Sequence, residues 1–223
     1  YKKISYKNDI LVLIDKWSAI CEADNVTFFI KEFKKYLKIK FLGNNTLNMS
    51  EKLREIIKNN KGKLISIDTV DYKSSFDDKN WLFLNCRDDN FKYINKFIKQ
   101  KFDLIYLDTQ HNEKHIKNIF NLYFDQLKVG GIFLVDDIFW LPYTKGSYRD
   151  NFHIEINNRE SFSGIMDIYN SNLDKVELIL SPKHTGMAKF IKLKNKKLNY
   201  FKKIKNRQFG FKNYIRNLRN FFI

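Results

Sequence analysis

The chain has 223 residues, a length that suits one large domain or two small ones, and the alternation of strands and helices described below favours one. Its composition, 43% hydrophobic and 16% aromatic, excludes disorder for most of the chain. Cys21 and Cys86 are too few for a disulfide framework or a zinc cage, so we expect a reducing compartment. The net charge of +16 is uneven: residues 192–223 hold eleven Lys or Arg and no acid, whereas residues 1–191 carry a net +5. This distribution argues against a nucleic-acid-binding surface over the whole body.

No apolar run approaches the roughly 18 residues that a transmembrane span requires. The first residues also lack the charged and apolar pattern of a signal peptide. We therefore expect a cytoplasmic location, with the basic tail as a means of peripheral attachment to the inner membrane.

Hydrophobic residues at helical spacing predict two helices within the first forty residues. The two sets are Ile10, Leu13, Ile14, Trp17 and Ile20, and then Ile30, Phe33 and Leu37. We expect residues 1–36 to form an N-terminal helical cap. A weak strand follows at Leu37–Leu42 and ends at Gly43, and a helix covers Thr46–Asn59.

The middle of the chain alternates apolar strands with amphipathic helices. Strands are predicted at Lys63–Ile67, Trp81–Leu84, Phe102–Leu107 and Ile132–Val135, and helices at Phe91–Lys99 and His111–Leu127. Gly130-Gly131 predicts a turn between the last of these helices and the strand that follows it. After a polar and aromatic loop, Trp140–Asn158, we expect a helix at Ser161–Tyr169 and closing strands at Val176–Leu180 and Met187–Leu193.

Strands that alternate with helices in this way predict βαβ units and a largely parallel sheet. The fold class is therefore α/β and Rossmann-like, with helices on both faces of the sheet. We expect the α/β domain to span residues 37–193 and a basic amphipathic tail to occupy residues 194–223.

Acidic residues follow several of the predicted strands. They are Asp68, Asp88 with Asp89, Asp108, and Asp136 with Asp137. In open α/β sheets ligands bind outside the carboxyl ends of the strands. The sequence therefore predicts a row of carboxylates along the ligand-binding edge.

The segment from Phe102 to Ile138, FDLIYLDTQHNEKHIKNIFNLYFDQLKVGGIFLVDDI, resembles the second half of class I S-adenosylmethionine-dependent methyltransferases. It is most similar to small O-methyltransferases with D-x-x-H after the fourth strand and D-D after the fifth. GKLISID, which ends at Asp68, resembles the second strand of the same fold. The resemblance covers residues 37–193 and implies a seven-stranded sheet whose last strand is antiparallel.

This resemblance implies a binding site for S-adenosylmethionine. Asp68 matches the acid that accepts hydrogen bonds from the ribose hydroxyls, a role that suits a two-oxygen acceptor, and Asp88 loosely matches the acid near the adenine. The family turn E-x-G-x-x-x-G is altered in Y-L-K-I-K-F-L-G-N-N-T-L, which has Lys38 and Lys40 in place of an acid and a glycine. The cofactor-binding residues retained in this turn are Gly43, Asn44 and Thr46.

The resemblance also implies a metal site like that of catechol-type O-methyltransferases. Its ligands would be Asp108, Asp136 and Asp137, because three carboxylates suit octahedral Mg²⁺. His111 lies three residues after Asp108 and would accept the substrate proton, so His111 and Asp108 are the predicted catalytic pair.

Structural interpretations of the same residues remain open. An acid after a strand can cap the next helix, a D-D pair can be a solvated turn, and His111 can be an ordinary first-turn residue. His115 is assigned to the surface. Cys86 is assigned as a buried thiol rather than a nucleophile, because no activating partner is visible in the sequence.

The tail predicts a basic amphipathic helix. Its apolar residues are Phe211, Tyr214, Ile215, Leu218, Phe221 and Phe222, with Lys212, Arg216 and Arg219 on the other side. Residues 199–223 are therefore predicted to contact an anionic membrane, and docking on the domain or on a second subunit of a homo-oligomer is the alternative.

The sequence thus favours an O-methyltransferase that uses S-adenosylmethionine and Mg²⁺ on a hydroxylated small molecule or a sugar. A non-enzymatic descendant of the fold is the first alternative, favoured by Lys38 and Lys40. RNA methylation is the second and weaker one, because the fourth strand ends in D-T-Q-H rather than in an N-P-P-Y-like motif. A nicotinamide dehydrogenase is disfavoured, since no G-x-G-x-x-G follows a strand.

Overall fold

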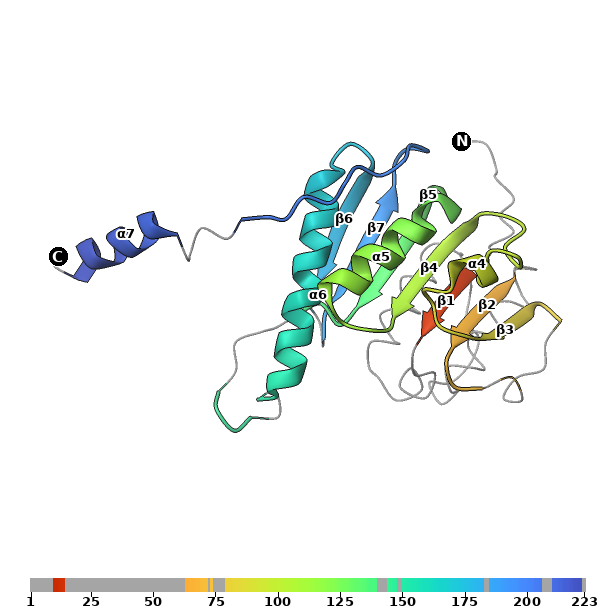
Figure 1. The fold of residues 1–223 in the computed structure, drawn as a ribbon, viewed down its shortest axis with the longest axis horizontal. Helices are drawn as coiled ribbons and strands as arrows, with labels where there is room; N and C mark the ends of the chain where they lie inside the picture. The colour runs from red at the N-terminus through yellow and green to blue at the C-terminus, as the bar shows by residue number, and fades with distance from the viewer. Residues whose placement is uncertain are drawn as a thin grey trace, which may run out of the picture.

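The computed structural model describes residues 10–14, 63–71, 73, 79–139, 144–147, 150–182, 185–205 and 210–221. Its strands are β1 (Ile10–Ile14), β2 (Leu64–Asp68), β3 (Trp81–Asn85), β4 (Phe102–Asp108), β5 (Leu127–Asp136), β6 (Val176–Ser181) and β7 (Met187–Lys192). Its helices are α4 (Phe91–Ile94), α5 (Glu113–Tyr123), the 3₁₀ helix η2 (Phe124–Gln126), α6 (Phe152–Ser171) and α7 (Phe211–Phe221). Figure 1 shows these elements in chain order.

The strands form one sheet in the order β3-β2-β1-β4-β5-β7-β6. The pairs from β3 to β5 are parallel, whereas β7 runs antiparallel to both β5 and β6. The carboxyl ends of β2, β3, β4 and β5 therefore lie along one edge of the sheet. This arrangement confirms the Rossmann-like α/β architecture predicted from the alternation of strands and helices.

The central strand β1 corrects the prediction for the N-terminal region. Ile10–Ile14 pairs with β2 on one side and β4 on the other, so these residues are a strand and not the start of a helix. The physical reason is a run of five apolar residues between Asp9 and Asp15, which suits a strand with neighbours on both sides. The boundary at residue 37 therefore does not separate a helical cap from the sheet.

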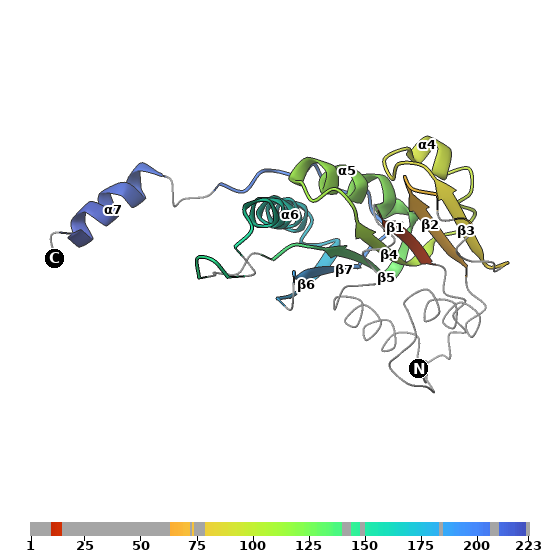
Figure 2. The ribbon, with the colours of Figure 1, turned by 90° about the horizontal axis from the view of Figure 1, so that it is seen from below.

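Helices α5 and α6 pack side by side over one face of the sheet, as Figure 2 shows. Lys117 of α5 forms an ion pair with the buried carboxylate of Asp167 on α6. Gly164 permits a close approach, because a methyl group there would lie 3.2 Å from the carbonyl oxygen of Glu113. The predicted helix at Thr46–Asn59 lies outside the described residues, as does the predicted strand at Leu37–Leu42.

The core between these helices and the sheet is aromatic. Phe120 of α5 is fully buried, and its ring centroid lies 4.8 Å from that of Phe133 and 4.7 Å from that of Phe190. Phe124 stacks on it at 5.4 Å, and Phe201 contacts its edge at 6.4 Å. The core thus joins α5, β5, β7 and the segment that follows β7.

Several predicted boundaries differ from the structure. The helix predicted at Phe91–Lys99 is the single turn α4, which ends at Ile94 with Asn95 as its C-cap, a residue type that favours helix ends over helix interiors. Gly130-Gly131 lies inside β5 at a register shift against β4, where the positive φ of Gly130 is tolerated because glycine has no Cβ. Helix α6 begins at Phe152, nine residues before the predicted start, because the Asn151 side chain accepts hydrogen bonds from two amides of the first turn.

Within the described ranges, no helix combines the length and the hydropathy that crossing a bilayer requires.

Lys192, at the end of β7, is fully buried and contributes to stability rather than to a binding surface. Its Nζ donates hydrogen bonds to the carbonyl oxygens of Phe124 and Leu127, each at 2.9 Å, and lies over the Phe124 ring. Burial lowers the pKa of Lys192. The ammonium group therefore satisfies two carbonyls where η2 joins β5.

We expect Lys192→Met to lower the free energy of unfolding by about 1–3 kcal/mol, because it leaves both buried carbonyls without a donor. Urea denaturation checks this value. Lys194→Met is the matched control, since Lys194 is half exposed and its ion pair with Asp174 is long, so a change within about 0.5 kcal/mol is expected. Equal values for the two variants would contradict the assigned role.

Candidate active site

The predicted carboxylates lie at the carboxyl edge of the sheet. Asp68 is the last residue of β2, Asp108 the last of β4 and Asp136 the last of β5, while Asp88 follows β3 by three residues. They separate into two neighbouring groups. One group surrounds a cleft near β2 and β3, and the other lies between the ends of β4 and β5.

The cleft opens to solvent, and its cavity volume is about 50 Å³. It is lined by Asp68, Thr69, Cys86, Arg87, Asp88, Thr109, Gln110 and His115. Asp68 is only 2% exposed, and one of its carboxylate oxygens accepts the backbone N–H of Val70 at 2.8 Å. The two predicted cofactor residues that the structure describes, Asp68 and Asp88, therefore share one cleft.

Asp88 is held in place by helix α5. His115 Nε2 lies 2.8 Å from the carboxylate of Asp88 and 3.1 Å from the hydroxyl oxygen of Thr109. Because a carboxylate only accepts hydrogen bonds, the Nε2 atom carries the proton and donates a hydrogen bond to Asp88. The Tyr123 hydroxyl donates to the Asp88 carbonyl oxygen at 2.7 Å, so both the side chain and the backbone of Asp88 are fixed.

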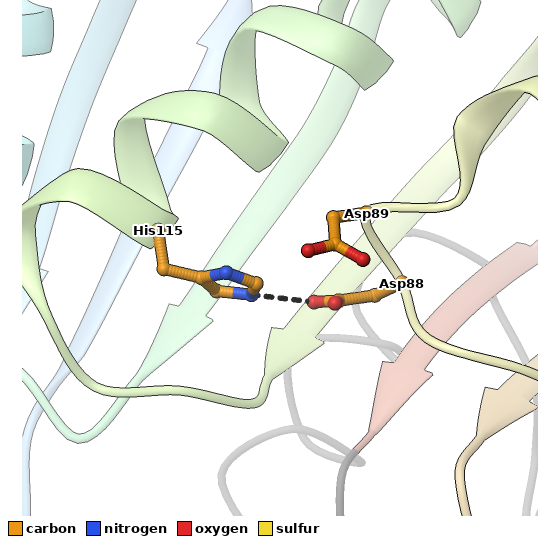
Figure 3. A group of neighbouring side chains, drawn as sticks. All are labelled: Asp88, Asp89 and His115. Atoms are coloured by element: carbon orange, nitrogen blue, oxygen red, sulfur yellow. Dashed lines mark hydrogen bonds and ion pairs between the residues drawn. The ribbon is translucent and has the colours of Figure 1, made fainter.

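Figure 3 shows His115 reaching from α5 to the loop after β3. His115 is 8% exposed, so its assignment to the surface is wrong. The signal that reveals its burial is helical spacing: His115 shares a stripe with Ile116, Ile119, Phe120 and Tyr123, all of which are buried. Sequence reasoning thus missed the residue that orients Asp88.

Asp89 lies beside this pair, but Arg87 holds it. The guanidinium donates to both carboxylate oxygens, at 3.0 and 2.8 Å, and this hydrogen bonding lowers the pKa of Asp89. Asp88, Asp89 and His115 are close enough together to surround an ion, but each already has a protein partner. We interpret the cluster as a polar frame for the cleft.

Cys86 lines the same cleft as a free thiol. Burial, together with the nearby Asp88 carboxylate, raises the pKa of Cys86. A raised pKa keeps the thiol protonated near neutral pH, so Cys86 is a poor nucleophile. Cys86 was predicted to be a buried thiol rather than a nucleophile, and the structure shows it partly buried.

The second group consists of Asp108, His111 and Asp137. His111 Nε2 lies 3.7 Å from an oxygen of Asp108 and 3.4 Å from an oxygen of Asp137. All three side chains are partly exposed, and one ligand atom of each lies within 4.8 Å of the others. The structure therefore brings together the catalytic pair His111 and Asp108 with one of the two D-D acids.

Asp136 points into the protein instead. The Tyr106 hydroxyl donates to its carboxylate at 2.6 Å, and the Asp137 amide donates to the other oxygen at 2.9 Å. Burial and the neighbouring Asp137 carboxylate raise the pKa of Asp136 to about 7. Of the three predicted metal ligands, the structure groups Asp108 and Asp137 with His111 and turns Asp136 towards Tyr106.

The turn that follows β5 contacts the loop before β7. Asp137 adopts a φ of 53°, which asparagine and aspartate tolerate better than most residues. The next residues are fixed by this loop, because the Phe139 amide donates to Thr185 at 2.7 Å and the Phe139 carbonyl accepts from Asn158. Gly186 is required there, since a Cβ would lie 2.1 Å from that of Phe139.

The predicted glycine-rich turn lies outside the described residues. This holds for Gly43, Asn44 and Thr46, and equally for Lys38 and Lys40. The described site therefore comprises the β2–β3 cleft and the group at the ends of β4 and β5.

Comparisons with known proteins find similarity to methyltransferases. Residues 40–138 match the sequence model of a family described as "Methyltransferase domain". These residues include Asp68 and Asp88 of the cleft and Asp108, His111 and Asp137 of the second group. The match covers less than half of the chain, and it makes this part of the chain similar to a methyltransferase domain.

Solved methyltransferases share the fold. The MycE methyltransferase from the mycinamycin biosynthetic pathway, solved with Mg, SAH and mycinamycin VI, matches with a TM-score of 0.52 and 15% identity over 76% of this chain and 49% of that chain. The SAH-bound methyltransferase PaMTH1 of Podospora anserina matches with a TM-score of 0.51 and 14% identity over 66% and 67%. This chain thus spans about half the length of MycE. No curated protein matches the sequence.

Proposed function

We propose that the protein is an S-adenosylmethionine-dependent O-methyltransferase that acts on a hydroxylated small molecule or a sugar with the help of a divalent ion. One observation carries this proposal. Two buried or nearly buried carboxylates line a cleft at one end of the carboxyl edge, and an Asp–His–Asp group lies at the adjacent strand ends.

The residues of the cleft suit the nucleoside part of the cofactor. Asp68, at the end of β2, is a two-oxygen acceptor, and a vicinal diol presents two hydroxyl donors that match such a carboxylate. Asp88, oriented by His115, offers an acceptor for the adenine amino group. When bound, S-adenosylmethionine would supply an electrophilic methyl group.

The donor set of the second group suits a divalent ion. Asp108 and Asp137 offer hard oxygen ligands from two neighbouring strands, as Mg²⁺ prefers. When bound, the ion would lower the pKa of an acceptor hydroxyl. We propose that His111, which lies within 4 Å of both carboxylates, takes the proton of that hydroxyl.

Calorimetric titration of the full chain tests the proposal in two steps. We expect S-adenosylhomocysteine to bind without added metal, and Mg²⁺ to bind the loaded protein only while Asp108 and Asp137 are both present. Asp108→Asn and Asp137→Asn are the variants, and Asp103→Asn is the control, because Asp103 pairs with Lys128 away from the strand ends. The protein is then incubated with S-adenosylmethionine and each of a panel of catechols and sugars. Release of S-adenosylhomocysteine identifies the acceptor.

Each outcome has a defined meaning. Absence of S-adenosylhomocysteine binding would support the non-enzymatic alternative and overturn the enzymatic one. If Asp137→Asn binds S-adenosylhomocysteine and transfers the methyl group fully without metal, the divalent ion is no longer part of the proposal, but the methyltransferase activity is.

We expect His115→Leu to weaken S-adenosylhomocysteine binding about tenfold, because one charge-assisted hydrogen bond that orients Asp88 is lost. His115→Gln is the matched variant, since its amide can donate to Asp88 from a similar position, and it should restore most of the affinity. Titration calorimetry measures both. If Leu and Gln weaken binding equally, His115 does not act through Asp88.

A further inference from the structure

Helix α7 exposes an apolar stripe. Its members are spaced at i, i+3, i+4 and i+7, which places them on one face of the helix. They are Phe211, Tyr214, Ile215 and Leu218, whose exposed fractions are 76%, 61%, 50% and 43%. In Figures 1 and 2 the helix stands clear of the sheet and of α5 and α6. The stripe is therefore available to a partner.

The rest of the helix surface is basic and polar. Lys212, Arg216 and Arg219 accompany the stripe. Apart from the buried Lys192, the segment 193–223 contains ten basic residues and no acid, whereas residues 1–191 carry a net charge of only +5. A partner that matches α7 must therefore combine negative charge with an apolar interior.

The segment that leads to α7 is hydrogen-bonded to α6 and to the residue that follows it. The Asn199 amide donates to the Asn172 side chain at 2.8 Å, and the Lys202 amide donates to Ser171 Oγ at 2.8 Å. The Ile204 amide donates at 2.7 Å to Asp167, the buried acid that also pairs with Lys117. The chain is therefore held to α6 up to residue 204, and α7 begins seven residues later.

We propose that α7 binds the surface of an anionic membrane and so holds the methyltransferase domain close to the lipid. A bilayer meets both faces of the helix at once, because the headgroups attract its basic residues and the acyl boundary takes its apolar stripe. A nucleic acid would satisfy the charges and leave the stripe in water. A second copy would bring a body that is itself positively charged to a basic helix.

Vesicle flotation with the full chain tests this proposal. We expect the fraction bound to phosphatidylcholine vesicles that contain phosphatidylglycerol to exceed the fraction bound to pure phosphatidylcholine about tenfold, and to fall as salt is raised. Removal of residues 206–223, which keeps the hydrogen-bonded segment, should abolish the difference. Ile215→Asn with Leu218→Asn should reduce binding at least tenfold through the apolar face alone.

The charge control compares two triple variants with the same change in net charge. The first variant replaces Lys212, Arg216 and Arg219 with Gln and should lose vesicle binding. The second replaces three lysines exposed on the body, Lys92, Lys96 and Lys99, with Gln and should retain it. Equal binding by the two variants would overturn the proposal. Binding to single-stranded RNA without binding to vesicles would also overturn it. The same holds if light scattering shows a dimer that depends on Ile215 and Leu218 and the protein does not bind vesicles. None of these outcomes bears on cofactor binding, which is measured separately.

Discussion

Asp68→Asn is expected to weaken S-adenosylhomocysteine binding about 100-fold. The variant replaces an acceptor oxygen, on a side chain that is 2% exposed, with an amide that donates. Hydrogen bonds to a charged group contribute about 1.5–3 kcal/mol, and about 1.4 kcal/mol corresponds to a factor of ten. The remaining oxygen can still accept from the Val70 amide, so the turn after β2 should persist.

Titration calorimetry with S-adenosylhomocysteine measures the effect, and Asp174→Asn is the control. Asp174 is more than half exposed and forms only a long ion pair with Lys194, so this change should leave affinity and stability as they are. Circular dichroism melting separates loss of binding from loss of fold. A folded Asp68→Asn variant with unchanged affinity would show that the ribose is not read by this carboxylate.

The elements around the site were predictable because their patterns are unambiguous. Phe102–Asp108 is a nearly continuous apolar run, and α5 carries a complete buried stripe at helical spacing. A strand that ends in an acid and feeds such a helix defines which edge of a parallel sheet holds the ligand. The position of Asp68, Asp88 and Asp108 on one edge follows from these two patterns alone.

The sequence pattern does not decide whether the N-terminal element is a helix or a strand, because five consecutive apolar residues fit both the helical and the strand period. Ile10, Leu13 and Ile14 fit one face of a helix, yet the whole run Ile10–Ile14 also fits a strand buried on both faces. Pairing with β2 and β4 decides between them, and pairing depends on residues fifty or more positions away. Local sequence does not contain that information.

Two details of the site were within reach of sequence reasoning. Successive residues of a strand point to opposite faces, so adjacent acids at the end of β5 are not expected to point the same way. Tyr106 pairs with Leu134, two residues before Asp136, which places the tyrosine on the same face as Asp136. This register accounts for the direction of Asp136 towards Tyr106, whereas Asp137 lies beyond the end of β5 and has a φ of 53°.

The buried Asp136 should make the free energy of unfolding fall as pH rises from about 4 to 7. Its pKa is raised from an ordinary value of 3.8 to about 7 in the folded protein. In this interval the folded protein holds a proton that the unfolded chain has released, so raising the pH favours unfolding. The contribution is fully present below pH 4 and is lost as pH passes 7.

Asp136→Asn should therefore be more stable than the parent chain at pH 8 by about 2–4 kcal/mol in the presence of a chelator, and similar to it at pH 4, since the amide carries no charge. Urea denaturation across this pH range measures the difference. Tyr106→Phe removes a hydrogen bond that lowers the pKa of Asp136, so the loss of stability should extend to higher pH. Asp137→Asn removes a neighbouring charge that raises it, and the loss should move to lower pH. Parallel stability curves for the parent and Asp136→Asn would mean that Asp136 is ionised throughout, and the carboxylate would then be open to a metal ion beside Asp108 and Asp137.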